Sequence, residues 1–105
     1  MKVDIGLPSG AWSEIGPAAA DAEAQGFDSI STSELAHEAF LRLVLATQAT
    51  TRVDLATSIA IAFARSPMVL AQMSWDLHAN SGGRFNLGLG TQVKGHNVRR
   101  FSLPW

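Results

Sequence analysis

The sequence predicts an α/β fold, namely the N-terminal portion of an incomplete (β/α)8 TIM barrel with a parallel sheet. Four apolar, β-rich runs recur about every 26 to 29 residues, and segments with helical patterning lie between them. Strands that alternate with helices at this spacing form βαβ units, whose strands pair in parallel. The turn after the first run, Leu7–Trp12, has no GxGxxG pattern, which a doubly wound dinucleotide-binding sheet would place there. The barrel is therefore the favoured architecture.

The four predicted strands are short runs rich in residues that favour extended structure. The third run is apolar with little alternation, which is expected of a strand that is buried on both faces of a parallel sheet. The runs are Lys2–Leu7, Ser29–Ser33, Val53–Ile61 and Arg84–Leu89.

Three predicted helices separate these strands, and each has its own boundary signals. The first begins at Ser13 or Pro17, is rich in alanine and ends before Gly26, the residue type that commonly follows a helix. The second, about Glu38–Thr51, repeats apolar residues at i, i+3, i+4 and i+7. The third begins at Ser66-Pro67, an N-cap followed by proline at the first helical position, and ends at a pair of glycines.

Composition restricts the classes of function. The chain is 47% hydrophobic and 16% charged, which excludes a disordered protein. A net charge of −1 gives no electrostatic footprint for nucleic acid or for an anionic membrane surface. The absence of cysteine excludes a Cys-ligated metal site, and the histidine spacing fits no metal-ligand set. We expect a soluble, cytoplasmic protein with no signal peptide, no membrane span and no metal.

The number of predicted elements indicates part of a larger domain. A complete barrel needs about 250 residues. Four strands and three helices, followed by the tail Gly90–Trp105, would leave both edges of the sheet open, which proteins normally avoid. We therefore interpret residues 1–105 as the truncated N-terminal part of one barrel domain.

Five segments, in this order and spacing, resemble the luciferase-like monooxygenase superfamily. They are VDIGLP, AEAQGFDSI, SELAHEAF, LATSIAIAFARSPMVL and SGGRFNLGLG. The final stretch, GTQVKGHNVRRFSLPW, is similar to the F420-dependent oxidoreductase subgroup of that superfamily. The resemblance implies a (β/α)8 barrel of roughly three times this length. It also implies that coenzyme F420, or alternatively FMN, carries the hydride while the protein supplies orientation and polarity.

Glu34 and His37 follow the second predicted strand, at the end where barrels carry their active sites. The resemblance implies that this acid and this histidine are the catalytic pair, which manages protons beside the cofactor ring. The two residues between them depart from the commoner adjacent arrangement. The structural alternative is that Glu34 caps the next helix and that His37 is solvated.

Ser58, Ile59 and Ala60 lie within the third predicted strand. They match the place where the family has a bulge with a non-prolyl cis peptide behind the cofactor ring, and the resemblance implies that they bind the cofactor. The alternative is a plain buried strand.

A second cofactor-binding set, Gly90, Thr91 and Gln92, follows the fourth predicted strand. Glycine lets the backbone approach a ligand closely, and the two polar side chains can hydrogen-bond to the ring or substrate. The alternative is an ordinary strand-to-loop turn. A family carboxylate often lies just past this threonine, but Val93 and Lys94 occupy those positions, so we expect no catalytic acid there.

The substrate-binding candidates lie near the two ends of the chain. Trp12, in the loop after the first strand, could stack on a substrate. Lys94, His96 and Arg99 form a basic cluster with Arg100, and this cluster could bind a substrate carboxylate or phosphate. The alternative for the cluster is a solvated helix face.

These observations predict an oxidoreductase that transfers a hydride between F420 and a small organic substrate. Family members bind the cofactor phosphate with late barrel loops, so we expect the 105-residue chain to bind cofactor weakly and to be inactive alone. We expect the full-length parent to be a homo-oligomer. The alternatives are an FMN-dependent monooxygenase fragment, a non-catalytic remnant, or a half-barrel that needs a partner chain.

Overall fold

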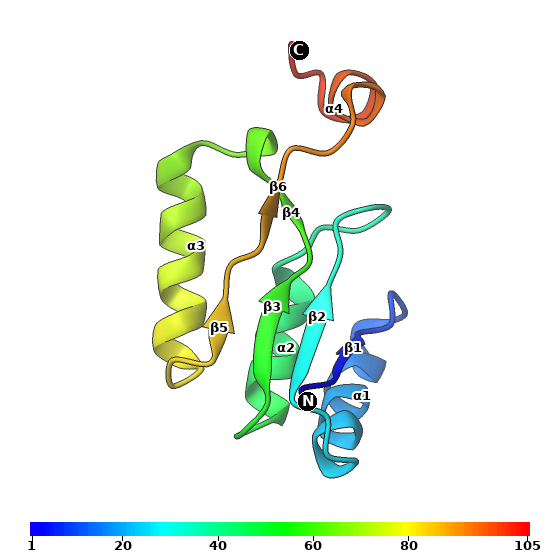
Figure 1. Ribbon diagram of the computed structural model, residues 1–105, viewed down its shortest axis with the longest axis vertical. Coiled ribbons are helices and arrows are strands. Elements are labelled where there is room, and N and C mark those ends of the chain that lie inside the picture. The colour runs from blue at the N-terminus through cyan, green and yellow to red at the C-terminus, as the bar shows by residue number, and fades with distance from the viewer.

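A computed structural model describes all residues, 1–105, and confirms the predicted fold class. A parallel sheet is covered on one side by helices (Figure 1). The elements are β1 (Asp4–Gly6), α1 (Trp12–Ala24), β2 (Ser29–Thr32), α2 (Leu41–Ala49), β3 (Asp54–Thr57), β4 (Ala60–Ile61), the 3-10 turn η1 (Ala62–Ala64), α3 (Pro67–Asn80), β5 (Phe85–Asn86), β6 (Leu89–Gly90) and α4 (Lys94–Phe101).

The order of the strands identifies the architecture as the first part of a barrel. The main sheet has the order β1-β2-β3-β5, and every pair is parallel. Each strand of the main sheet therefore lies next to the strand of that sheet that precedes it along the chain. A doubly wound sheet would reverse its strand order at a switch point, and none occurs here.

Two predicted strands are each broken in the structure, which corrects the expected count of four. The third breaks between β3 and β4, where the Ser58–Ile59 peptide bond is cis, and the fourth breaks between β5 and β6 at Leu87 and Gly88. Beyond the break, β4 and β6 pair in parallel as a separate two-stranded sheet. The Thr57 hydroxyl bonds to both the amide and the carbonyl oxygen of Gly88, so a side chain replaces the backbone ladder at this point.

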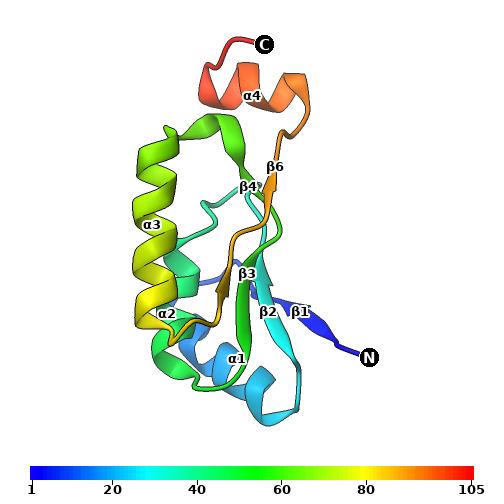
Figure 2. The same cartoon turned by 60° about the vertical axis from the view of Figure 1, so that its left-hand side comes forward.

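Two further expectations are corrected at the ends of the chain. The predicted tail contains a helix, α4, which lies beyond the β6 end of the molecule (Figure 2). Trp12 is the first residue of α1 and does not lie in the preceding loop. None of the helices combines the length and hydropathy that a membrane crossing requires.

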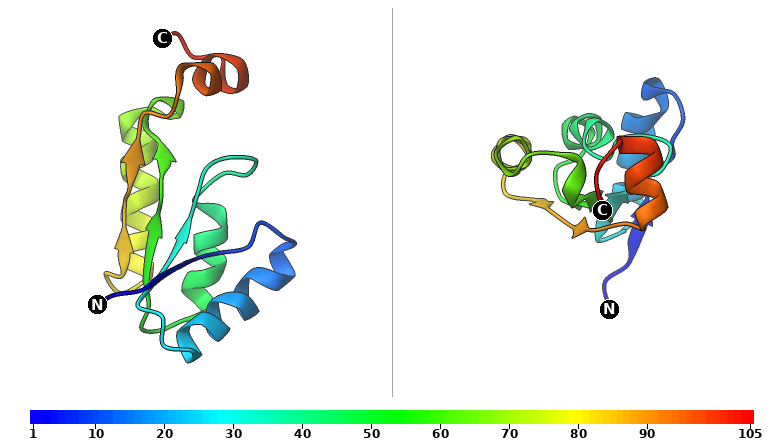
Figure 3. Two further views of the ribbon diagram at one scale, coloured as in Figure 1. Left: turned by 45° about the vertical axis from the view of Figure 1, so that its right-hand side comes forward. Right: turned by 90° about the horizontal axis from the view of Figure 1, so that it is seen from above.

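The hydrophobic core lies between the sheet and helices α1, α2 and α3, which form an arc over one face (Figure 3). Ile30, Leu55 and Phe85 are register partners on β2, β3 and β5, and all three are buried in this core. The other core members are Ala19, Ala22, Ala39, Phe40, Leu43, Ala46, Val53, Ala60, Leu70 and Leu77.

The opposite face of the sheet is polar where β1 meets β2. The carboxylate of Asp4 accepts hydrogen bonds from the hydroxyls of Ser29 at 2.9 Å and Ser31 at 2.7 Å. Residues at alternate strand positions face opposite sides, so this is the side away from the helices. In a closed barrel it is the side that faces the interior.

The helix boundaries show which sequence signals hold. Ser66 caps α3 by accepting the amide of Val69 at 3.2 Å, as predicted. Gly26, with φ of 92°, follows the C-cap of α1, where a left-handed residue favours glycine. The second helix begins at Leu41, three residues later than predicted, because the Glu38 carboxylate accepts the Leu41 amide and caps the helix there.

Candidate active site

The predicted site residues converge at the carboxyl ends of β2, β4 and β6. The β2–α2 loop carries Glu34 and His37, and the segment Ser58–Ile61 enters and forms β4. Gly90 ends β6 and pairs with Ile61. Active sites of (β/α)8 barrels lie at this end of the strands, because the loops there come together over the barrel.

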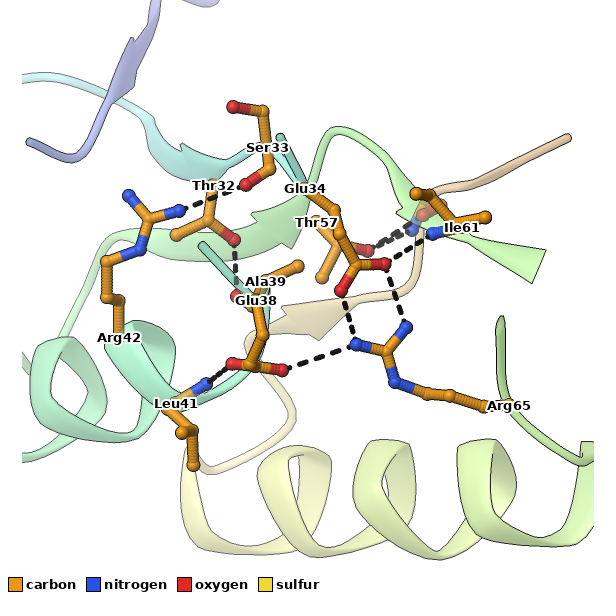
Figure 4. A network of polar contacts seen from close by, with 11 residues as sticks. Thr32, Ser33, Glu34, Glu38, Ala39, Leu41, Arg42, Thr57, Ile61 and Arg65 are labelled. Atoms are coloured by element: carbon orange, nitrogen blue, oxygen red, sulfur yellow. Dashed lines mark hydrogen bonds and ion pairs between the residues drawn. The ribbon is translucent and has the colours of Figure 1, made fainter. Parts of the chain in front are cut away.

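Glu34 is buried at this end, with 4% of its surface exposed. Its Oε1 accepts the backbone amide of Ile61 and one terminal nitrogen of Arg65, both at 2.8 Å. Its Oε2 accepts the other terminal nitrogen of Arg65, so the ion pair is bidentate (Figure 4). Both oxygens of the predicted catalytic acid are therefore engaged within the protein.

The environment of Glu34 keeps it ionised. Burial raises the pKa of Glu34, but the hydrogen bonds from Arg65 and Ile61 and the charge of Arg65 outweigh burial, so the net pKa is lowered. Hydrogen bonding to Glu34 in turn raises the pKa of Arg65. At neutral pH Glu34 is a carboxylate that accepts hydrogen bonds, and its proposed part in proton transfer stays a prediction.

Arg65 is held by more than Glu34. One of its terminal nitrogens lies 3.4 Å from a carboxylate oxygen of Glu38, and its guanidinium lies over the ring of Phe40 at 4.9 Å. Nearby, the buried Arg42 donates to the carbonyl oxygens of Ser33, at 3.0 Å, and Leu7, at 3.4 Å. Two arginines thus hold the loops that follow β1 and β2.

The segment Ser58–Ile61 is fixed on both sides. The Ser58 amide donates to the carbonyl oxygen of Thr32 at 2.6 Å, and the Ala60 amide donates to that of Gly88 at 2.9 Å. A Cβ placed on Gly90 would come within 2.7 Å of Cδ1 of Ile59, so glycine is what allows β6 to approach this segment. The structure therefore brings the two predicted cofactor-binding sets together.

Thr91 and Gln92 continue from β6 into α4. The Thr91 carbonyl oxygen accepts the side-chain amide of Asn97, which is completely buried, at 2.8 Å. Gln92 has a positive φ of 58°, and its Oε1 accepts the amide of Val93 at 3.1 Å. These bonds fix the turn that leads into α4.

His37 and Trp12 are exposed and lie on a common cavity of about 110 Å³, together with Glu38 and Arg42. His37 also lines a second cavity of about 220 Å³, which Glu34, Arg65 and Arg100 border. The predicted catalytic pair therefore meets at this second cavity, with His37 exposed and Glu34 buried.

The predicted basic cluster lies on α4, and none of its side chains has an acidic partner. Lys94 and Arg99 are exposed, and His96 lies 3.4 Å from Arg100. Of the four, Arg100 borders the Glu34 cavity. The structure thus places Lys94, His96 and Arg99 near one another but outside this cavity.

Sequence reasoning missed Arg65, the residue that organises the site. A signal was available, because Arg65 is the only charged residue between Asp54 and Asp76. A lone cation within an apolar run is expected to find an ionised partner when it is partly buried. Nothing in the sequence spacing identifies that partner as Glu34, 31 residues earlier.

The residues around Ser58–Ala60 differ in their exposure to solvent. Ser58 and Thr91 are exposed, and Ile59 is half-buried. Two apolar side chains of neighbouring elements are exposed: Phe63 in η1, at 55%, and Leu89, the register partner of Ala60, at 46%.

Comparison with known proteins finds a matching family model and two similar proteins of Mycobacterium tuberculosis. The model of a family described as luciferase-like monooxygenase matches residues 2–105. The Mycobacterium tuberculosis protein Rv1360, which is uncharacterized, is 46% identical over the whole chain, and the match covers 31% of Rv1360. Rv3520c from the same organism, named as a coenzyme F420-dependent oxidoreductase, is 36% identical, with 95% of this chain and 32% of Rv3520c covered.

Solved structures show the same fold. Coenzyme F420-dependent tetrahydromethanopterin reductase from Methanopyrus kandleri matches 99% of this chain with a TM-score of 0.85 and 25% identity, over 30% of its own length. The oxygenating constituent of 3,6-diketocamphane monooxygenase from Pseudomonas putida, solved with FMN, matches 93% of the chain with a TM-score of 0.80 and 21% identity, over 31% of its length. The chain spans about a third of the length of the proteins it matches.

Proposed function

We propose a function for this chain from its membership of the luciferase-like monooxygenase family, to which it belongs. The chain forms the part of an oxidoreductase that faces the cofactor ring. The enzyme transfers a hydride between coenzyme F420 and a small organic substrate. One observation carries the proposal: β4 (Ala60–Ile61) pairs with β6 (Leu89–Gly90), and the Ile61 amide of this pair donates to Glu34, which borders the cavity that His37 also lines. When bound, the cofactor supplies the hydride chemistry.

The residues of this chain have separate parts in the proposal. Ser58, Ile59 and Ala60, together with Gly90, form the wall against which the ring lies. Thr91 and Gln92 hydrogen-bond to polar atoms at its edge. His37, which is exposed on two cavities, exchanges protons with the substrate or the ring, and Glu34 provides the ionised carboxylate of the pair.

In the proposal, the residues that contact the substrate lie at the rim of the site. Trp12 offers an exposed ring for stacking beside His37. Lys94 and Arg99 offer cations on α4 without acidic partners, and His96 offers a ring nitrogen beside them, which together suit a substrate carboxylate or phosphate. A cytoplasmic location, which the absence of cysteine favours, and a homo-oligomeric full-length parent are part of the same proposal.

F420 is favoured over FMN as the cofactor. Rv3520c, at 36% identity, is named for coenzyme F420, and the final stretch of this chain resembles the F420-dependent subgroup. FMN remains the alternative, because a family fold that binds FMN superposes well on this chain, at the lower identity of 21%.

A half-barrel that needs a partner chain is the second candidate, and the open sheet favours it. β1 and β5 each have one neighbour in the main sheet, so both edges are free to pair. On α3, Trp75 is 72% exposed, although its helical position suggests packing against a barrel. The remainder of a barrel would cover these features.

The test compares the chain alone with the chain joined to the remainder of Rv1360, in place of the matching segment of that protein. Each is titrated with F420 and with FMN while ligand fluorescence is followed. We expect saturable F420 binding by the joined protein, weaker FMN binding, and little binding of either by the chain alone. Tighter binding of FMN than of F420 would favour the monooxygenase alternative. Micromolar binding of either ligand by the chain alone would contradict the expectation that cofactor binding needs the missing strands.

A matched variant locates the site. Gly90→Val places a branched side chain against Ile59, where even a Cβ is too close, and we expect it to weaken ligand binding about tenfold or more. Gly16→Ala, on α1, where an added Cβ would meet only the Cβ of Ala49 at an ordinary contact distance of 3.7 Å, is the control and should leave ligand affinity unchanged.

A further inference from the structure

Arg65 lies between η1 and α3, and nothing in the family comparison assigns it a role. It forms the two ion pairs of the molecule, with Glu34 and Glu38. Its side chain is 14% exposed and that of Glu34 is 3% exposed, so the pair is largely removed from water. Figure 4 shows the guanidinium facing the Glu34 carboxylate edge to edge. A bidentate pair of this kind fixes direction as well as distance.

The ion pair is tied to the backbone of β4. The same Oε1 of Glu34 that binds Arg65 also accepts the amide of Ile61 at 2.8 Å. On its other side β4 pairs with β6, where Ile61 is in register with Gly90 and the Ala60 amide donates to Gly88. The backbone of Ser58–Ile61 is therefore held between a charged pair and a strand.

We propose that Arg65 and Glu34 are positioning residues that fix the backbone of Ser58–Ile61 against β6, and so set the surface on which the cofactor ring rests. The identity of that ring rests on the proposed function, whereas the restraint on the backbone does not depend on it. Arg65 binds Glu34 with a planar fork, and Glu34 passes the constraint to the amide of Ile61. Neither residue needs to touch the cofactor.

The arrangement explains why an arginine and a buried carboxylate are used here. Lysine offers a point charge on a flexible stem, whereas the guanidinium matches both carboxylate oxygens in one plane. Glu38 and the ring of Phe40 hold the guanidinium from its remaining sides. Glu34 is thus anchored at both oxygens, and its orientation toward Ile61 is fixed.

The first measurement uses the chain without cofactor. Amide hydrogen exchange by NMR is followed at Ile61 and Ala60, and Leu55, whose amide bonds to Arg84 in the main sheet, is the internal reference. We expect Glu34→Gln and Arg65→Gln to raise the ratio of Ile61 exchange to Leu55 exchange by about tenfold or more, because a buried charged hydrogen-bond network is lost. Arg65→Lys, which keeps the charge, should restore part of the protection.

Two controls separate positioning from loss of stability. Glu38→Gln removes the other carboxylate on Arg65 without touching Ile61, so the exchange ratio should change little. Glu23→Gln weakens contacts at the opposite end of the sheet and should speed Ile61 and Leu55 together, which leaves the ratio constant. An unchanged ratio in Glu34→Gln and Arg65→Gln would overturn the proposal.

The second measurement links the restraint to the ring. The chain joined to the remainder of Rv1360 is titrated with F420 and FMN in the same variants. Glu34→Gln and Arg65→Gln should weaken the preferred ligand about tenfold, with partial recovery in Arg65→Lys. A raised exchange ratio with unchanged affinity would overturn the link to the ring. If the unsubstituted protein binds neither ligand, the proposed function fails, while the exchange ratio still decides whether the pair restrains β4.

Discussion

The side chain of Thr57 and the backbone of Gly88 form a reciprocal pair. The Thr57 hydroxyl donates to the carbonyl oxygen of Gly88 at 2.8 Å and accepts its amide at 2.9 Å. Thr57 is the last residue of β3, and Gly88 lies in the break between β5 and β6. A single hydroxyl therefore joins two neighbouring strands where both leave the main sheet and turn toward the candidate site.

Removing this hydroxyl should destabilise the chain. Thr57→Val keeps the shape but leaves the amide of Gly88 without a partner, which costs about 1–3 kcal/mol when such a group is shielded from water. The Gly88 carbonyl oxygen loses one of its two hydrogen bonds and keeps the one from the Ala60 amide. Urea unfolding followed by circular dichroism measures the loss. Thr57→Ser keeps the hydroxyl, removes only the methyl group and is the control, so a loss in Thr57→Val no larger than that in Thr57→Ser would contradict the prediction.

Gly88 and Gly90 should respond differently to alanine. A Cβ on Gly88 would meet the backbone oxygen of Thr57 at 2.1 Å, which cannot move without breaking the pair. A Cβ on Gly90 would meet the end of the Ile59 side chain at 2.7 Å, which can be shortened. Ile59→Val removes Cδ1 but keeps a Cγ that would lie 3.0 Å from the new Cβ, so we expect it to recover part of the stability lost in Gly90→Ala, and none of that lost in Gly88→Ala. Thermal unfolding of the single and double variants checks this, and equal recovery at both glycines would refute it.

The features of the fold that depend on local sequence signals were predictable. The spacing of apolar runs predicted parallel βαβ units, and Ser66-Pro67 predicted the start of α3, because caps and periodicity act within a few residues. The strand breaks were not predictable from pattern, because they depend on Thr57 reaching a backbone 31 residues away. The helix α4 was not among the three predicted helices, although a solvated helix face was one interpretation of its basic cluster.

The candidate site was predictable as positions but not as contacts. Glu34 and Gly90 were expected after strands and Ser58–Ala60 within the third strand, and the structure brings these positions together. The sequence could not predict the hydrogen bonds that Glu34 accepts from Arg65 and Ile61, because they depend on the register between separate βα units. Partners for buried charges are set by tertiary structure.

Acid should weaken the chain through Glu23 at the amino end of the strands. Burial raises the pKa of Glu23, but backbone hydrogen bonds from Val53, Arg52 and Thr51 outweigh it, so the net pKa is lowered below the ordinary value of 4.5. A lowered folded-state pKa contributes stability that is present above the unfolded value and is lost as pH falls through the folded value.

Glu23→Gln should therefore lower the free energy of unfolding at pH 7 and flatten its decline below pH 4.5. Urea unfolding from pH 7 down to pH 3 measures both changes. Glu14→Gln, at an exposed carboxylate in the first turn of α1, is the control. If the free energy of unfolding of Glu23→Gln declines with falling pH as steeply as that of the unsubstituted chain, the acid sensitivity belongs to other carboxylates. Glu34, whose pKa is also lowered, is the first of these.

Trp75 should be a contact for the missing part of the barrel and contribute little to the chain by itself. It is 72% exposed on α3, between two open cavities of about 280 Å³ and 560 Å³ that Ala71 also lines. Trp75→Ala should change the free energy of unfolding of the chain by no more than about 0.5 kcal/mol. It should weaken association with the separately produced remainder of Rv1360 about tenfold or more, as followed by tryptophan fluorescence, because burial of a large aromatic side chain is lost. Trp12→Ala, at a tryptophan that is 60% exposed on α1, is the matched control. Equal weakening by both variants, or by neither, would show that the α3 face does not contact the remainder of the barrel.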